Sequence, residues 1–220
     1  MKKLITLAAI LFTGFLSVQA QKVVYNENVQ KRTISSFHSI ETSSGIEVIM
    51  SKGDKEELAV SVGNTEYLDL VKTVVEGGVL KISRTSDNWK FWNKYKNWKV
   101  TVYVSYVNID LIKATSGGSV TGSDVSFTKL TAHINSGGSI SLTGNVESLD
   151  VDGNSGGQFR GYSLSVNNCR ADVNSGAGVQ ITVTKEISAK ANSGGFIRFK
   201  GDGLIRDINV NSGGSVKRQS

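Results

Sequence analysis

The chain has 220 residues, with 25 lysines and arginines against 19 aspartates and glutamates, one cysteine and no proline. The lone cysteine, Cys169, excludes an intramolecular disulfide and a cysteine-based zinc site. A formal net charge of +6 is a mild excess that is compatible with an anionic partner but does not require one. Proline cannot donate to a β ladder, so its absence suits a chain made mostly of paired strands.

The N-terminus has the layout of a secretory signal peptide. Lys2 and Lys3 precede an apolar run over residues 4–18, and Ala20 ends a segment with the small-residue pattern of a cleavage site. The alternative is a membrane anchor, but the run is shorter than the roughly 20 apolar residues that a spanning helix needs. We expect residues 1–20 to be a signal peptide, with no transmembrane segment left after its removal. The protein would then be exported to the periplasm, the outer-membrane surface or the medium, with its formal charge lowered from +6 to +4.

Residues 37–113 show the period-two alternation of half-buried strands. Candidate strands lie at 46–50, 58–62 and 100–104, and a hairpin is expected around Glu76-Gly77-Gly78. Asn64 is placed to cap a single helical turn over residues 67–71. After a lead segment at 21–36, we expect residues 37–113 to form irregular coils that begin a β-helix and cover its N-terminal end.

Residues 89–99 contain all three tryptophans of the chain and four lysines. Aromatic faces stack on sugar rings, and lysines attract anionic groups. A competing interpretation is structural: a long hairpin whose aromatic side chains pack over the open end of the β-helix. The candidate binding residues are Trp89, Lys90, Phe91, Trp92, Lys94, Tyr95, Lys96 and Trp98.

The C-terminal half repeats a Ser-Gly-Gly segment, with one Ser-Gly-Ala variant, at an almost constant period. The serines of the six segments are 20, 19, 20, 18 and 19 residues apart, at Ser116, Ser136, Ser155, Ser175, Ser193 and Ser212. A period this short is typical of a solenoid. Alternating apolar residues flank each turn, which predicts short strands that bury one face only when the repeats stack. Five of the six segments begin with asparagine, and we expect these side chains to form a hydrogen-bonded column.

These observations predict an all-β, single-stranded parallel β-helix. We expect one β-helix domain over residues 37–220, with the Ser-Gly-Gly coils at 114–220 and the irregular coils before them. Cys169 falls at an inward position, so core packing is its expected role.

Alignment of the repeats places Asp152 beside Asp172 in an outward column, about one strand spacing of 4.8 Å apart. Paired carboxylates can bind a hard cation or perform acid–base chemistry. His133 and Lys190 flank the pair, and mixed charge on a solvated sheet face is the ordinary outcome. Asp152 and Asp172 are therefore weak candidates only, and we expect no metal site, no cofactor and no Ser-His-Asp arrangement.

The order of the N-terminal motifs, followed by the repeats, resembles the putative auto-transporter adhesin, head GIN domain family. The similarity covers about residues 37–217, and its opening motifs lie at residues 44–48, 53–54, 58–60, 68–70 and 78–82. The resemblance implies a right-handed β-helix, export and an adhesion role. It carries no catalytic residues that could be transferred to this chain.

We therefore expect a non-catalytic binding or structural module of the cell envelope, with a glycan, envelope-surface or protein partner and no nucleic-acid partner. One alternative is a carbohydrate-active enzyme, a polysaccharide lyase or hydrolase, on the same scaffold. Another is an envelope protein that self-associates through the edge of its C-terminal coil, because an uncovered strand edge invites pairing with a second copy.

Overall fold

In the computed structural model, which describes residues 29–85 and 98–220, fifteen strands form a single winding sheet, and one 3₁₀ helix lies between two of them in the chain. The N-terminal elements are β1 (Val29–Arg32), β2 (Ser39–Thr42), β3 (Glu47–Lys52), β4 (Glu57–Val62), η1 (Thr65–Leu70), β5 (Val71–Glu76), β6 (Val79–Arg84), β7 (Val100–Tyr106) and β8 (Leu111–Ala114). The C-terminal strands are β9 (Ser119–Ile134), β10 (Ser139–Gly153), β11 (Gln158–Val173), β12 (Gly178–Ala191), β13 (Phe196–Lys200), β14 (Leu204–Val210) and β15 (Ser215–Arg218).

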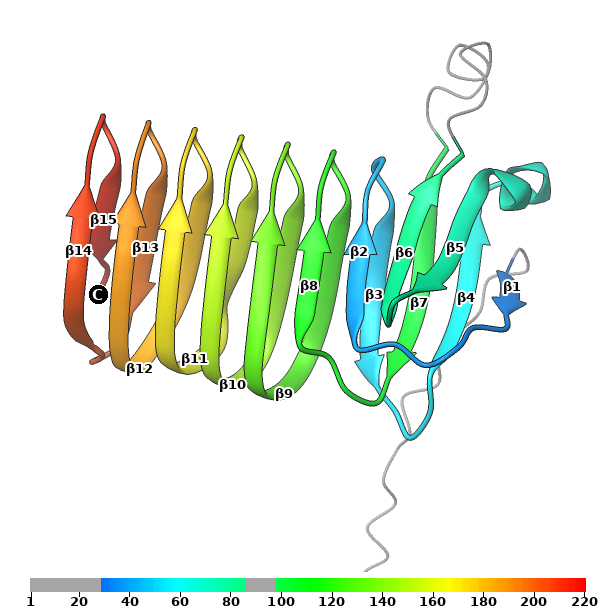
Figure 1. The fold of residues 1–220 in the computed structure, drawn as a ribbon, viewed down its shortest axis with the longest axis horizontal. Helices are drawn as coiled ribbons and strands as arrows, with labels where there is room; N and C mark the ends of the chain where they lie inside the picture. Colours follow the sequence, from blue (N-terminus) through cyan, green and yellow to red (C-terminus); the bar gives the residue numbers. More distant parts are fainter. Residues whose placement is uncertain (1–28, 86–97) are drawn as a thin grey trace, which may run out of the picture.

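The C-terminal half is the predicted parallel β-helix (Figure 1). Strands β9 to β12 pair in parallel with their neighbours, so that each strand passes once around the coil. Along β9 the buried and exposed residues alternate, except where two exposed residues follow one another at 123–124 and at 128–129. These two interruptions turn the chain at corners, and the inward residues between them form one continuous apolar core.

Each Ser-Gly-Gly segment forms a tight turn at the upper edge of Figure 1. The two central residues lie in the left-handed region, as in Ser136 (φ 49°) and Gly137 (φ 71°), and the Gly138 N–H donates to the Asn135 carbonyl over 2.9 Å. Serine rather than asparagine therefore adopts the positive φ. This is the geometry of a two-residue hairpin turn with both central residues at φ > 0.

The asparagine side chains do not form the expected hydrogen-bonded column along the stack; four of the five bond within their own turn instead. The Asn135 side-chain oxygen accepts a hydrogen bond from the Ser136 N–H of its own turn over 2.8 Å, and Asn154, Asn174 and Asn192 make the equivalent bond. Successive turns are joined instead by backbone, as when the Gly117 N–H donates to the Ser136 carbonyl over 3.1 Å. The carboxamide satisfies its own turn because the following N–H is nearer than the next coil.

The N-terminal half does not follow chain order along the stack. Strands β2 and β3, joined by a Ser44–Gly45 turn of the same conformation, lie directly beside β8 and β9. Strands β6 and β7 come later in the sequence but lie outside β2 and β3. Strands β1, β4 and β5 then pair antiparallel and do not continue the parallel winding. The expected hairpin around Gly77 and the Asn64-capped helical turn are both present.

The two ends of the stack differ. At the N-terminal end Tyr67 and Leu68 of η1 and Trp98 pack against the core. At the C-terminal end every residue of β14 is exposed, including Leu204 (63%), Ile205 (48%), Ile208 (40%) and Val210 (44%). Ile205, Ile208 and Val210 are in register with buried residues of β12, so they are core positions without a further described coil to cover them.

Candidate functional site

The aromatic segment predicted to bind ligand lies mostly outside the described residues, which include only Trp98 of its eight candidates. The Trp98 ring centroid is 4.8 Å from that of Tyr67, and the Arg84 guanidinium carbon lies 4.3 Å from the Trp98 ring centroid. Burial lowers the pKa of Arg84, and its guanidinium also donates to the Trp98 carbonyl over 3.2 Å. Trp98 thus occupies the place that the structural interpretation of this segment assigns to it, against the end of the core.

Asp152 and Asp172 are in register on β10 and β11, as the repeat alignment predicted. The Asp172 carboxylate lies 3.2 Å from the Lys190 ammonium of the next coil. Further along the same column Lys113 pairs with Glu41 over 2.9 Å. Among residues 29–85 and 98–220, no group of three or more His, Cys, Asp or Glu side chains is arranged to hold a metal ion. The column is a run of mixed charges across a solvated face.

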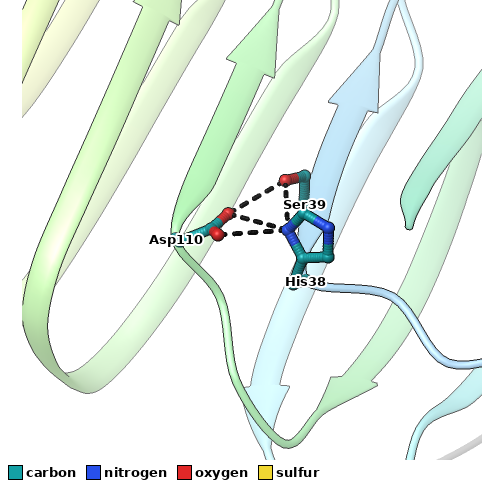
Figure 2. Close-up of polar contacts among 3 residues, drawn as sticks. All are labelled: His38, Ser39 and Asp110. Carbon is teal, nitrogen blue, oxygen red and sulfur yellow. Dashed lines mark hydrogen bonds and ion pairs between the residues drawn. The ribbon is translucent and has the colours of Figure 1, made fainter. Parts of the chain in front are cut away.

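The structure brings His38, Ser39 and Asp110 together, although Asp110 is more than 70 residues away in sequence (Figure 2). Both carboxylate oxygens of Asp110 lie 3.1 Å from His38 Nδ1, and the buried Ser39 hydroxyl donates to Asp110 over 3.0 Å. The Ser39 hydroxyl also lies 3.1 Å from the same Nδ1 atom. A nucleophilic triad needs the serine on one imidazole nitrogen and the carboxylate on the other. This cluster therefore lacks the geometry that activates a serine.

The His38–Asp110 contact joins elements of the scaffold. The Asp110 N–H donates to the His38 carbonyl over 3.0 Å, and the Thr131 N–H donates to the Asp110 carbonyl over 2.8 Å. Burial favours the neutral carboxyl of Asp110, but hydrogen bonds from His38 and Ser39 outweigh it and lower the pKa of Asp110 below its ordinary value. The cluster fixes the β7–β8 connection to β2 and β9. No sequence motif marks it, because its members meet only through the crossover of the chain.

A groove of about 680 Å³ lies where the β7–β8 connection passes the corners of β9, β10 and β11. This connection runs along the lower edge in Figure 1, opposite the Ser-Gly-Gly turns. We call it the polar groove. It is lined by Lys52, Tyr106, Val107, Asn108, Ile109, Ser126, Phe127, Thr128, Lys129, Asn145, Val146, Glu147, Ser165 and Asn167.

The polar groove has a closed apolar floor and a hydrogen-bonding wall. Tyr106 and Phe127, with ring centroids 5.8 Å apart, are buried in the floor together with Val146. Burial raises the pKa of Tyr106, so its phenol stays neutral at physiological pH. On the wall Ser126, Asn145 and Ser165 are in register on successive coils. Sequence reasoning missed the groove, since its residues come from five separate stretches with no shared motif.

Most polar side chains of the groove form no hydrogen bond or ion pair with another group that the structure describes. Asn167 is the exception, because its side-chain oxygen accepts a hydrogen bond from Thr184 over 2.9 Å. The hydrogen-bonding groups of the groove are therefore available to a ligand. The residues without such a partner are Lys52, Asn108, Ser126, Thr128, Lys129, Asn145, Glu147 and Ser165.

The fold defines the class of protein as an all-β parallel β-helix. Residues 36–203 match the family described as "Putative auto-transporter adhesin, head GIN domain", and the chain belongs to this family. The family resemblance seen in the sequence is thereby confirmed. A comparison with curated protein sequences gives no match.

Two solved structures share the fold. A putative adhesin from Bacteroides fragilis NCTC 9343 has 16% identity and a TM-score of 0.66, with 87% of this chain and 96% of that chain covered. A putative lipid binding protein from Parabacteroides distasonis ATCC 8503 has 20% identity and a TM-score of 0.50, with 89% and 98% covered. In the part of the chain that the structure describes, no helix is long and apolar enough to cross a membrane.

Proposed function

We propose that this chain is an exported, adhesin-like binding module of the cell envelope that performs no catalysis and binds a glycan or another envelope surface. The observation that carries the proposal is the polar groove, a hollow whose wall consists of hydrogen-bonding side chains without partners in the described chain. These side chains are exposed or half-buried and bonded to no described group, so they can exchange water for a ligand in the hollow. Membership of an adhesin-type family supports the same function.

The chemistry of the described residues favours binding over catalysis. Glu147 is the one carboxylate among the described lining residues of the groove, whereas glycoside hydrolysis ordinarily uses a pair. Burial raises the pKa of Cys169 to about 12, so its thiol is no nucleophile at neutral pH. A carbohydrate-active enzyme on this scaffold is the alternative, and release of reducing ends from a bound polysaccharide would favour it.

The test is binding of residues 21–220 to isolated bacterial envelopes and to a glycan array. The double variant Asn145→Ala/Lys129→Ala should lose most of the binding, because it removes wall groups while leaving the buried floor intact. Thr121→Ala/Lys72→Ala is the matched control, since both residues are exposed strand positions outside the groove. Equal binding by wild type and the Asn145→Ala/Lys129→Ala variant would exclude the polar groove as the binding site.

The aromatic segment at residues 89–98 is proposed as a second contact with the same surface. Its tryptophans and lysines offer stacking and charge, and this proposal rests on composition alone. Trp92→Ala should weaken envelope binding and leave the melting temperature unchanged. A variant that binds normally would remove the segment from the proposed function.

Self-association is a second candidate function, favoured by the exposed last coil. Strands β14 and β15 each pair with one neighbour only among the described strands, so one side of their backbone has no ladder partner there. Four large apolar side chains of β14 are exposed beside this edge. The opposite end is covered by η1 and Trp98. We therefore propose that two copies meet through their C-terminal coils, because this is the end that offers both apolar surface and open backbone.

A further inference from the structure

The wall of the polar groove repeats along the axis of the β-helix. Ser126, Asn145 and Ser165 are in register on β9, β10 and β11. Parallel strands are spaced by about 4.8 Å, so the three side chains span about 10 Å along the axis. The spacing of about 4.8 Å between neighbouring wall residues is close to the length of one pyranose residue in an extended sugar chain. A linear sugar polymer lying along the axis would meet one wall residue with each successive ring.

The chemistry of the wall matches hydroxyl groups. A sugar hydroxyl both donates and accepts a hydrogen bond, and the Asn108 and Asn145 carboxamides and the Ser126 hydroxyl also do both. These side chains have no described partner, so a ligand would not need to break an internal bond to reach them. The apolar floor exposes little surface, because Tyr106 and Val146 are each 2% exposed and Phe127 is 9% exposed. The groove thus offers little surface to an acyl chain, which argues against a lipid tail as its occupant.

The charge of the groove favours an acidic sugar. Lys52 and Lys129 are exposed at the groove and form no ion pair with a described residue, while Glu147 is the one acid among the described lining. The local balance is one positive charge. An ammonium without a protein partner gains from a carboxylate within a few ångströms, although water and salt screen the attraction.

From this placement we infer that the polar groove binds a linear acidic oligosaccharide, aligned with the β-helix axis across coils β9, β10 and β11. The inference rests on the proposed binding function and names its ligand class and orientation. Asn145 forms hydrogen bonds with ring hydroxyls at the centre of the wall, and Lys129 contacts a uronate carboxylate at the rim of the groove. The ligand covers about three sugar residues, one for each coil.

Calorimetric titration of residues 21–220 with a uronate hexasaccharide and with a neutral hexasaccharide of the same linkage tests the inference. The uronate should bind more tightly, and its affinity should fall as salt is raised. Asn145→Ala should lower the affinity for both ligands about five- to tenfold, because each ligand loses a hydrogen bond. Lys129→Gln should weaken the uronate alone and bring its affinity to that of the neutral chain. Thr121→Ala and Lys72→Gln serve as controls, and unfolding curves check that each variant is folded.

Equal affinity for the two ligands, or uronate binding that Lys129→Gln leaves intact, overturns the acidic specificity. If Asn145→Ala leaves the affinity for both hexasaccharides unchanged, the polar groove is not their binding site. If envelopes bind the wild type but not the groove variants, and neither hexasaccharide binds, the ligand class is wrong while the proposed function stands. If the wild type binds neither envelopes nor oligosaccharides, the proposed function fails as well.

Discussion

Glycine at the fourth position of each repeat turn lies against the backbone of the preceding coil. A Cβ at Gly138 would lie 2.1 Å from the Ala114 carbonyl oxygen, and one at Gly157 would lie 2.6 Å from the Ile134 carbonyl oxygen. The one departure is Ala177, which is buried beside Gly153. In the other repeat coils the position equivalent to Gly153 carries a side chain. Ala177 fits because Gly153, the residue beside it in the neighbouring coil, has no Cβ.

Gly138→Ala should therefore lower the free energy of unfolding by about 1–3 kcal/mol, because the added methyl group pushes two coils apart. Urea unfolding followed by circular dichroism measures the change. Gly63→Ala is the control, since nothing lies within 4 Å of its Cβ and the change should stay within about 0.5 kcal/mol. An unchanged midpoint for Gly138→Ala would show that the coils can separate without cost.

The Asp110 carboxylate makes a pH-dependent contribution to stability. Its folded-state pKa lies below the ordinary value of 3.8 because His38 and Ser39 hydrogen-bond to the ionised form against the opposing effect of burial. The stabilisation is thus fully present above pH 3.8 and is lost as the pH falls through the lower folded-state pKa. Urea unfolding at several pH values between about 2 and 6 should show a shallower acid dependence for Asp110→Asn than for wild type. Parallel curves for the two proteins would rule out this contribution.

At the scale of single elements, η1 and the residues around it close the N-terminal end of the core. Tyr67 of η1 and Arg84 of β6 both contact the ring of Trp98, which precedes β7, so three separate stretches of the chain meet at this ring. Only the strand order of the structure brings them together. The sequence allows two interpretations of Trp98, ligand binding and packing. Its contacts with Tyr67 and Arg84 support packing, and ligand binding by this residue stays a proposal.

Trp98→Ala should destabilise the fold by about 2 kcal/mol, less than a fully buried tryptophan because Trp98 is only partly buried. Trp98→Phe should cost less, since the ring contact with Tyr67 is retained. Thermal unfolding of the two variants gives the comparison. A melting temperature equal to that of wild type for Trp98→Ala would mean that the stack adds nothing to stability.

At the scale of the whole molecule, the β-helix has one covered and one open end. Light scattering at several concentrations should show a monomer–dimer equilibrium for residues 21–220. Ile208→Lys should shift it to monomer by placing a charge on the exposed end of the core. The matched control is Ile49→Lys, another exposed isoleucine that lies on β3 away from this end. A strict monomer at all concentrations would contradict association through the last coil.

Much of the fold could be predicted from local signals. The Ser-Gly-Gly period, the alternation along β9 to β12 and the in-register column of Asp152 and Asp172 all follow from repeats of nearly constant length. Such signals are sufficient because each coil contacts mainly its neighbours, so register is a local property. The predicted asparagine column is wrong, because an Asn side chain can form a hydrogen bond either within its own turn or with the next turn, and the sequence does not distinguish the two.

The amino-acid sequence by itself determined the class of fold, the repeat coils and the family, since turn chemistry and period-two burial act within about 20 residues. Tertiary structure alone decided which ends are covered, how Asp110 meets His38, and where the polar groove lies. The contact of Asp110 with His38 and the polar groove both depend on the β7–β8 connection, and β2 and β3 lie between strands that come later in the chain. Contacts of this kind join segments far apart in sequence, and no local pattern of residues encodes them.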